Sequence, residues 1–437
     1  MDIKQTPIFG SLVDQNPLMG AKHPSVAIGG VFKSQPAFLN LDEDILSKHL
    51  MLIGGTGSGK SNVFYHLIAQ IKKQLTPNDV MIIFDTKGDY YNLFKGKNDI
   101  VIGNSSTYYS ISEKWNIFKE ITADGWEEHK IEMNTNEISW SIFNDTIEKS
   151  KDPFFPNAAR DLFASIISLL IMNGRNDKKF REKNFYNSEL KKAIEGSTIL
   201  EIKNLIETQP SLKSVLSYIG DGTNGQALGV YADLLGTFRK LFTGIFAENG
   251  LFSIRNFIHA KGGRTLFIEY DLSIGSILSP IYSLLFDLAL KESLGRSHKE
   301  GNVYLICDEF KLLPHLEHID DGINFGRSLG VKVIAGLQSI NQLTEIYGEQ
   351  RGKNIAAGFS TYIAFRANDV HTREFVTNLH GKNYVMERYK TLTNTIKEEN
   401  RNANVVEDWH MIDLEIGEAI IGLPFRNPFK FKFNLYK

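Results

Sequence analysis

An apolar segment, a loop of small residues and a helix-like segment follow one another between residues 51 and 65. Together they constrain the kind of ligand that this chain binds. The loop, residues 54–61, reads Gly-Gly-Thr-Gly-Ser-Gly-Lys-Ser and fills every position of the pattern G-x-x-x-x-G-K-[ST]. Its glycines let backbone N–H groups turn toward a polyanion, and the helix that follows presents the positive end of its dipole. The segment therefore predicts a phosphate-binding loop for a nucleoside triphosphate.

The cofactors expected at this loop are ATP and Mg²⁺. Lys60 is expected to reach the β- and γ-phosphates, and the Ser61 hydroxyl is expected to bind Mg²⁺. The residues expected to contact the nucleotide are Gly54, Gly55, Thr56, Gly57, Ser58, Gly59, Lys60, Ser61 and Asn62.

Residues 302–310 supply the second half of the expected site, because an apolar run ends there in two acidic residues. Such a run is typical of a buried parallel strand. Asp308 is expected to hold Mg²⁺ through water, and Glu309 is expected to polarise the attacking water as a general base. The acidic pair favours ATP hydrolysis by a motor-type enzyme over a small GTPase switch, whose water is usually oriented by Gln. No guanine-reading N-K-x-D occurs in the sequence.

Composition narrows the class of protein further. The 437 residues allow two or three domains, and the single cysteine, Cys307, excludes a disulfide framework. The unbroken apolar segments are shorter than the ~20 residues that span a bilayer, and residues 1–5 lack the apolar core of a signal peptide. We therefore expect a cytoplasmic protein without an integral membrane segment. A net charge of −2 excludes a broadly basic nucleic-acid coat and leaves room for local basic loops.

The order of segments predicts an α/β fold with a mostly parallel sheet and a ligand at the carboxyl ends of its strands. Residues 79–85, 265–270 and 331–338 are expected to be further buried strands, and residues 429–433 an edge strand. The predicted organisation is a β-rich segment (1–48), a first part of the ATPase domain (49–172), a small all-helical insertion (173–225) and a second part of the ATPase domain (226–437).

Ten short segments resemble, in order, the coupling-protein ATPases of type IV secretion and conjugation (the TraD/TraG/TrwB group), which belong to the FtsK–HerA superfamily of ring-shaped pumps. Of these segments, only the phosphate-binding loop is a generic motif. The resemblance extends over roughly residues 25–425. The matching segments are residues 49–61, 84–89, 157–160, 251–254, 308–310, 326–330, 336–339, 342–343, 347–348 and 414–419.

The resemblance implies a RecA-like ATPase that forms a homohexamer and moves DNA, or protein attached to DNA, through a central pore. Gln338 matches the family's polar sensor of the γ-phosphate. Arg327 stands where an arginine finger is expected to reach the ATP of the next subunit, and Arg366 is a second candidate for that role. Candidate DNA contacts are Lys87 and the basic run at residues 178–183, for which a solvated helical face is the ordinary alternative.

Two alternative functions remain open on the sequence. Many coupling proteins carry N-terminal membrane spans, and we expect none here, so a soluble HerA-like ATPase that powers a partner nuclease or effector against invading DNA is one alternative. A nucleotide-gated module that recruits proteins without pumping DNA is the other. A relaxase or secretion-channel partner would accompany the coupling function, and a nuclease the defence function. Two weaker patterns are a metal pair at His315 and His318, and a nuclease-like Asp85-Thr86-Lys87.

Overall fold

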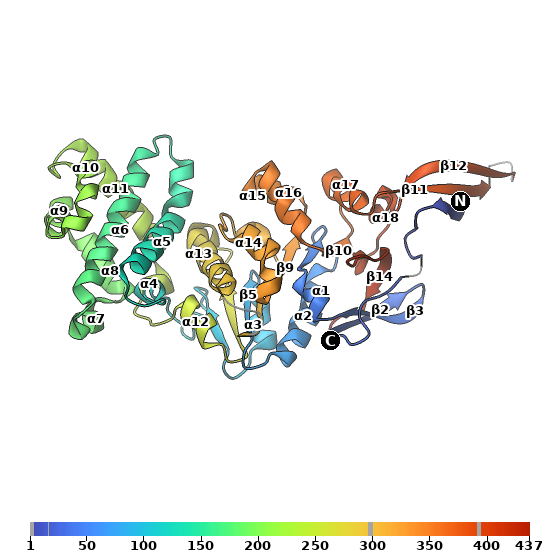
Figure 1. Cartoon of the computed structure of the whole chain (residues 1–437), viewed down its shortest axis with the longest axis horizontal. Coiled ribbons are helices and arrows are strands. Elements are labelled where there is room, and N and C mark those ends of the chain that lie inside the picture. Colours follow the sequence, from blue (N-terminus) through green and yellow to red (C-terminus); the bar gives the residue numbers. More distant parts are fainter. Residues whose placement is uncertain (1–3, 16, 296–299, 391–394) are drawn as a thin grey trace. The chain divides into compact units, whose positions relative to one another are not determined.

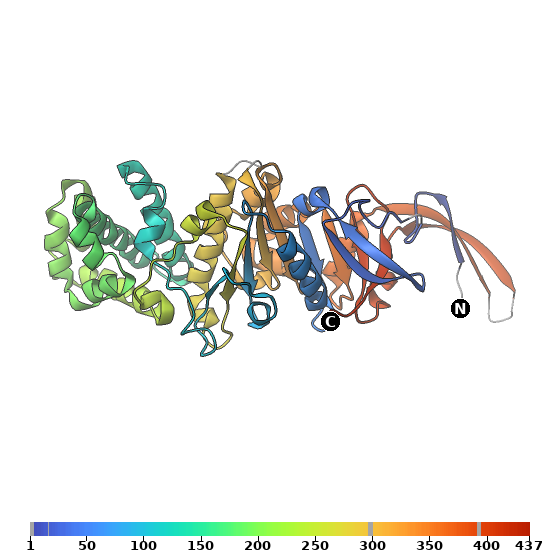
Figure 2. The same cartoon turned by 90° about the horizontal axis from the view of Figure 1, so that it is seen from below.

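The computed structural model describes residues 4–15, 17–295, 300–390 and 395–437. Its contacts divide the chain into two compact units, whose elements are drawn in Figures 1 and 2. Unit 1 comprises Met1–Phe84, Leu294–Lys311 and Ile319–Lys437, and unit 2 comprises Asp85–Ser293 and Leu312–His318. The units alternate along the sequence, so neither is formed by one continuous stretch.

Unit 1 is built on a mixed sheet with helices between its strands. Its strands are β1 (Lys4–Phe9), β2 (Val26–Phe32), β3 (Gln35–Leu41), β4 (Leu50–Ile53), β5 (Val80–Asp85, which ends at the unit boundary), β8 (Val303–Cys307), β9 (Val331–Leu337), β10 (Thr361–Phe365), β11 (Lys382–Lys390), β12 (Ile396–Asn404), β13 (Glu418–Gly422) and β14 (Phe429–Phe433). Its helices are α1 (Glu43–Ser47), α2 (Lys60–Gln74), α14 (Ile319–Asn324), η5 (Gly326–Leu329), α15 (Asn341–Tyr347), α16 (Glu349–Gly358), α17 (Val370–Leu379) and α18 (Asp408–Ile412).

The strands of this sheet follow the order β3-β2-β14-β13-β10-β4-β9-β8-β5. From β10 to β5 neighbouring strands run parallel, and from β10 outward through β13, β14, β2 and β3 they run antiparallel. Every residue of β4, β5, β8, β9 and β10 is buried, as expected for parallel strands covered on both faces. The strands predicted within residues 79–85, 302–310 and 331–338 are confirmed as β5, β8 and β9.

The prediction of an edge strand at residues 429–433 is wrong. β14 lies between β13 and β2, with Ile421 opposite Phe429 and Gly30 opposite Phe433. The phenylalanines of β14 are buried and the lysines between them are not. This alternation suggested a strand with one solvent-exposed face at the edge of the sheet. The hairpin of β2 and β3, from the other end of the chain, covers the edge that the local pattern left open.

Three strands form a second, smaller sheet in unit 1. β11 pairs antiparallel with both β1 and β12, and in Figures 1 and 2 the β11–β12 hairpin extends away from the larger sheet. The side chains of β12 are mostly exposed.

Unit 2 is largely helical. Its strands β6 (Ile100–Ile102) and β7 (Arg264–Glu269) pair in parallel, and β7 confirms the strand predicted at residues 265–270. Its helices are α3 (Asp89–Phe94), α4 (Ile117–Ile121), α5 (Glu128–Lys149), α6 (Phe154–Gly174), α7 (Lys178–Asn184), α8 (Asn187–Gly196), α9 (Ile199–Glu207), η1 (Pro210–Val215), α10 (Leu216–Ile219), α11 (Gly225–Leu241), α12 (Ile254–Ala260) and α13 (Gly275–Leu294).

The predicted insertion at residues 173–225 corresponds to the helices α7 to α10. These helices do not stand alone, because α6 packs against α5, α7, α9 and α11 in the same bundle. The run of helices thus begins before residue 173, while the predicted boundaries of independently folding domains stay predictions.

The helix α6 is long and apolar enough to cross a membrane by length and composition, which the sequence analysis did not anticipate. Of its most apolar window, 56% is buried within the protein. Leu162, Phe163 and Ile167 are fully buried, and α6 packs on both α5 and α11. This packing is that of a core helix in a helical bundle.

His49, which is buried before β4, makes the stability of unit 1 depend on pH. Its Nδ1 accepts a hydrogen bond from the Val333 N–H (3.0 Å), and burial lowers the pKa of His49 from 6.5 to about 4. The unfolded chain therefore takes up a proton at higher pH than the folded chain, so stability is lost as the pH falls from 6.5 toward 4. At pH 5 the loss is about 2 kcal/mol.

Urea unfolding at pH 7.5 and pH 5 measures this loss. We expect His49→Gln, whose amide oxygen can still accept the Val333 N–H, to lose about 2 kcal/mol less than the wild type over that interval. His23 is exposed, so His23→Gln serves as the control. An equal pH dependence of His49→Gln and the wild type would contradict the prediction.

Candidate functional site

The carboxyl ends of four neighbouring parallel strands of unit 1 meet at one edge of the sheet. Ile53 of β4 lies opposite Leu337 of β9 and next to Ala364 of β10, and Cys307 of β8 lies opposite Ala335. The backbone continues this pairing beyond the strands, because the Gly54 N–H donates to the Leu337 carbonyl (3.1 Å). The predicted phosphate-binding loop, the acidic pair and Gln338 are thereby brought together at this edge.

The loop between β4 and α2 has the backbone that its glycines predict. Gly59 has a φ of 116° and immediately precedes α2, so its N–H lies at the amino end of the helix. A Cβ on Gly59 would lie 3.0 Å from the Cα of Gly417, so a side chain there would be crowded as well as strained by the positive φ. The Lys60 ammonium folds back over the loop and donates to the carbonyls of Gly54 and Gly55. These carbonyls hold the ammonium at the place where phosphates are expected.

The acidic pair follows β8 directly, beside the end of β9. Asp308 is buried and Glu309 is half-buried, and Glu309 Oε2 accepts a hydrogen bond from the Gln338 amide (2.9 Å). Among the described residues, Glu309 Oε1 is enclosed and has no hydrogen-bond partner. Gly336 allows β9 to lie this close to the acidic pair, since a Cβ on Gly336 would lie 2.3 Å from the Asp308 carbonyl oxygen. Gln338 thus holds one carboxylate oxygen of Glu309 in place, and the other is enclosed by the protein.

Two side chains at this edge of the sheet carry oxygen atoms that suit Mg²⁺. The Ser61 hydroxyl is on the first turn of α2, and the Asp308 carboxylate is on the strand-end loop after β8. Hard oxygen donors of this kind, few in number, are the ligands with which proteins hold Mg²⁺ beside phosphates. The residues present therefore fit a magnesium ion.

The two arginines singled out by the sequence lie in different places. The Arg366 carbonyl accepts the Gly55 N–H (3.0 Å), so Arg366 borders the phosphate-binding loop of its own chain. Arg327 lies in η5, before the amino end of β9, where it forms an ion pair with Asp44 (2.8 Å). Its side chain is 55% exposed. Because β9 is seven residues long, Arg327 and Gln338 lie roughly 20 Å apart along the strand direction.

Sequence reasoning missed two contacts to the loop from the C-terminal part of the chain. The Gly417 N–H donates to the Ser58 carbonyl (2.9 Å). The Asn62 side chain binds the residues that follow β14, donating to the Asn434 carbonyl (2.9 Å) and accepting the Tyr436 N–H (2.7 Å). Gly417 lies within the matching segment 414–419, but no local pattern indicates what that segment touches.

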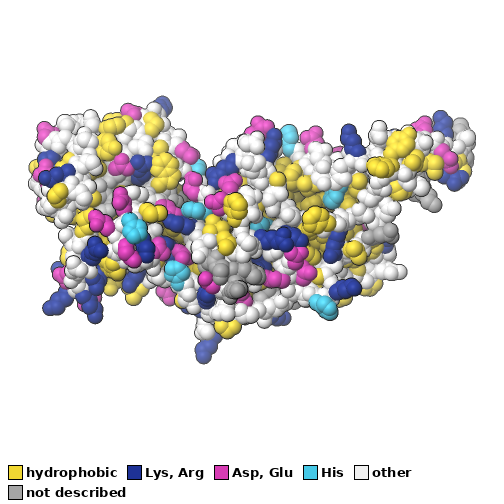
Figure 3. Space-filling model, viewed as in Figure 1, with side chains coloured by type: hydrophobic (Ala, Val, Ile, Leu, Met, Phe, Trp, Pro, Cys, Tyr) yellow, Lys and Arg dark blue, Asp and Glu magenta, His cyan; other side chains and the backbone are white. Residues whose placement is uncertain are grey.

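Most of the candidate DNA contacts, among them Lys87, are exposed, which fits both a DNA contact and a solvated face. Lys87 follows β5 in a loop held by Asp85, whose carboxylate accepts the N–H groups of Lys87 (3.2 Å) and Gly88 (2.8 Å). The Asp85 carboxylate therefore stabilises a turn, and this structural role accounts for its presence in the nuclease-like pattern. Lys and Arg side chains gather over α7 in Figure 3, and they are Lys178, Lys179, Arg181 and Lys183.

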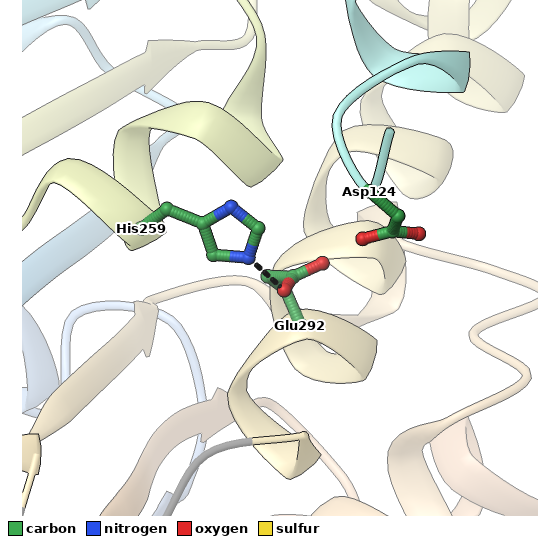
Figure 4. Close-up of side chains that lie close together, drawn as sticks. All are labelled: Asp124, His259 and Glu292. Carbon is green, nitrogen blue, oxygen red and sulfur yellow. Dashed lines mark hydrogen bonds and ion pairs between the residues drawn. The ribbon is translucent and has the colours of Figure 1, made fainter. Parts of the chain in front are cut away.

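Two clusters in unit 2 have the composition of metal sites. In Figure 4, Asp124, His259 and Glu292 face one another, and the second cluster contains Glu137, Asp287 and His318. The buried Arg255 guanidinium binds both Asp124 and Glu292, so a cation is already present in the first cluster.

The acidic residues of the second cluster also have partners within the protein. The Lys291 ammonium binds Glu137, and His318 Nδ1 hydrogen-bonds to Asp287 (2.9 Å). His315, the other histidine of the predicted pair, lies near Glu148 instead (3.5 Å). Both clusters are ion-pair networks that join helices of unit 2.

Comparisons with known proteins agree with this geometry. The family model described as "Type IV secretion-system coupling protein DNA-binding domain" matches residues 35–423. The coupling protein TraD of Escherichia coli K12 is 24% identical over 345 residues, which cover 77% of this chain and 44% of TraD. The conjugal transfer protein TraG of Agrobacterium fabrum is 22% identical over 269 residues, or 54% of this chain and 37% of TraG. The chain thus spans less than half the length of these curated relatives.

Solved structures of the plasmid coupling protein TrwB share the fold. TrwB in complex with ADP and Mg²⁺, and TrwB in complex with the ATP analogue ADPNP, each superpose with a TM-score of 0.73 at 19% identity. Each superposition covers 100% of this chain and 96% of the TrwB chain. The predicted α/β fold of the RecA-like P-loop type is confirmed.

Proposed function

The chain belongs to the family of type IV secretion-system coupling protein DNA-binding domains. On that premise we propose that it hydrolyses ATP to move DNA, as a cytoplasmic homohexamer that works with a relaxase and a secretion channel. The observation that carries the proposal is the hydrogen bond between Glu309 and Gln338, beside the phosphate-binding loop. The proposal assigns Glu309 as the general base and Gln338 as the polar sensor of the γ-phosphate. ATPase activity with and without single- and double-stranded DNA tests it directly.

Each residue at this edge has a distinct task in the proposed reaction. The loop N–H groups and Lys60 bind the phosphates, and Lys60 exchanges its carbonyl partners for phosphate oxygens. Mg²⁺ held by Ser61 and Asp308 would neutralise charge on the β- and γ-phosphates. Glu309 would accept a proton from the attacking water, while Gln338 holds its Oε2 and so restrains the direction in which the base points.

Arg327 is proposed to act on the ATP of a neighbouring subunit. It lies at the amino end of β9, whereas its own chain's loop lies at the carboxyl ends of the strands, and its side chain is half-exposed. A guanidinium so placed can neutralise the transferred phosphoryl group only across a subunit boundary. The interfaces are therefore heterologous, as a closed ring requires.

Arg366 is proposed to act within its own chain. Its carbonyl is bonded to Gly55 and its side chain is exposed at the same edge of the sheet. This position differs from the trans role considered for it in the sequence analysis. A guanidinium here adds positive charge beside phosphates that Lys60 alone would otherwise neutralise.

DNA is proposed to contact local basic groups, because the net charge of −2 gives no general attraction to it. Lys87→Ala should reduce the stimulation of ATPase activity by DNA about threefold to tenfold and leave basal activity within twofold, because Lys87 lies outside the nucleotide site. Loss of one phosphate contact per subunit should also make the slope of log K against log salt shallower. Lys97→Ala removes the same charge from another exposed lysine and serves as the control.

One outcome tests the DNA-moving function, and another tests Lys87 as the DNA contact. If DNA neither binds at low salt nor stimulates hydrolysis, the DNA-moving function is wrong. A protein-recruiting module then becomes the better account of the same ATP site. If DNA stimulates wild type and Lys87→Ala equally, the motor stands and the contact is elsewhere.

A further inference from the structure

The stretch of chain that follows the acidic pair leaves unit 1 and soon returns to it. After Glu309 the chain forms the short turn η4 (Phe310–Leu312), and residues 312–318 belong to unit 2. The chain then re-enters unit 1 as α14, which leads into η5 and Arg327. Residues 312–318, which we name the anchor segment, therefore lie in the sequence between the proposed general base and the proposed arginine finger.

Two histidines attach the anchor segment to helices of unit 2. The backbone N–H of His318 donates to the Asp287 carboxylate on α13 (2.8 Å), and the His318 ring bonds to the same carboxylate through Nδ1 (2.9 Å). Nδ1 of His315 lies 3.5 Å from a carboxylate oxygen of Glu148 on α5. Because His318 holds Asp287 through both its backbone and its side chain, a displacement of α13 would be carried to the anchor segment.

Charged groups on both helices strengthen this attachment. Asp287 is buried, and Glu137 of α5 lies 3.8 Å from Nε2 of His318 and binds Lys291 of α13. Burial lowers the pKa of His318, but the hydrogen bond to Asp287 and the attraction of Asp287 and Glu137 outweigh burial and the opposing Lys291, so its pKa is raised. The protonated form is favoured, and its bond to Asp287 is charge-assisted.

The path of the anchor segment is fixed by packing as well. Leu313 and Leu316 are fully buried. His315, between them, has a φ of 58°, a left-handed conformation that residues with side chains seldom adopt. Such a conformation persists where the surrounding contacts impose it. The segment is therefore held along its length and not only at His318.

The candidate DNA contacts and the ATP site lie in different units. Lys87 and α7 belong to unit 2, whereas the phosphate-binding loop and the acidic pair belong to unit 1. Stimulation of hydrolysis by DNA therefore requires unit 2 to act on unit 1. The chain crosses between the units after Phe84, Ser293, Lys311 and His318, and the last two crossings bound the anchor segment.

We propose that the anchor segment transmits the binding of DNA by unit 2 to the ATP site, and that the bond between His318 and Asp287 is its point of attachment. The proposal rests on the proposed function, because it assumes that DNA stimulates hydrolysis. A shift of α13 would displace the segment, and the continuous backbone would carry the displacement to Glu309 on one side and to Arg327 on the other. In this proposal His318 acts only through the backbone of the segment.

ATPase activity of the full chain without DNA and at saturating DNA tests the attachment, with single- and double-stranded DNA in separate assays. His318→Ala should reduce the DNA-dependent increase in turnover at least about fivefold, while basal turnover and the KM for ATP stay within about twofold of the wild type. His318→Asn should keep more than about half of the increase, because its side-chain amide can still donate to Asp287 from near the position of Nδ1.

A double-mutant cycle shows whether the two residues act through one bond. Asp287→Ala should give the same loss as His318→Ala, and the double variant should lose no more than either single variant. His371→Ala is the control, because His371 lies 3.8 Å from Glu374 in an exposed pair of the same kind and should keep the wild-type increase. Urea unfolding and the fluorescence anisotropy of labelled DNA measure the stability and the DNA affinity of each variant.

Four results would overturn the proposal. An unchanged DNA-dependent increase in both single variants would mean that the effect of DNA passes elsewhere. Equal proportional losses of basal and stimulated turnover would make the bond a support of the fold, and a loss explained by weaker DNA binding would make it a support of the DNA contact. If the wild type hydrolyses ATP and DNA does not stimulate it, the proposed function itself is wrong, and the proposal fails with it.

Discussion

Glu309→Gln is expected to bind ATP with nearly wild-type affinity and to hydrolyse it at least about 10²–10³-fold more slowly, which is the contribution of a positioned general base. Glutamine keeps the size of the side chain and can still bond to Gln338, but it cannot take a proton from water. Steady-state phosphate release measures turnover, and calorimetry measures ATP binding by the same protein.

Two further variants make this result specific. Lys60→Ala should lose ATP binding, since the ammonium that spans the loop is removed, so the two variants fail at different steps. Glu345→Gln makes the same chemical change at an exposed carboxylate on α15 and should have wild-type activity. Wild-type hydrolysis by Glu309→Gln would show that another group is the base.

Arg327→Ala is expected to reduce turnover by about 10³-fold, in the range found for arginine fingers, without weakening ATP binding. Wild-type activity per mole of chain should rise steeply with protein concentration, because in the proposed ring the finger and the loop meet only across a subunit boundary. Arg388→Ala is a matched control, since Arg388 is equally exposed (55%) and equally paired with a carboxylate, that of Glu398.

Mixing two inactive variants tests whether the finger acts across a boundary. An Arg327→Ala subunit has an intact loop, and a Lys60→Ala subunit has an intact finger. In an equal, random mixture of heterologous interfaces, about a quarter combine the intact halves, so up to about a quarter of wild-type activity should return. No recovery at any ratio, or activity that is independent of concentration in a strict monomer, would contradict the proposed ring.

The parts of the site that a local pattern determines could be predicted from the sequence. The phosphate-binding loop needs its glycines within eight residues, and the acidic pair directly follows an apolar run, so both were found where the structure has them. The buried parallel strands were recognisable for the same reason.

What could not be predicted depends on pairings between distant segments. β14 reads as an edge strand until β2, some four hundred residues earlier in the chain, is known to pair with it. The contact of Arg366 with the loop follows from β10 lying beside β4, and the contact of Gly417 follows from the path of the chain into β13. The pattern of residues within each of these segments does not indicate which distant segment lies beside it.

The order of strands in the large sheet also governs when the nucleotide site can exist during synthesis. β4 and the loop emerge from the ribosome early, but the strands on both sides of β4 are β9 and β10, from the last third of the chain. At ~5–20 residues per second, the loop waits tens of seconds for these neighbours. Until then its strand has no partners and its lysine lies far from the acidic pair. We therefore expect ATP hydrolysis by a nascent chain to begin only after β9 and β10 have been synthesised.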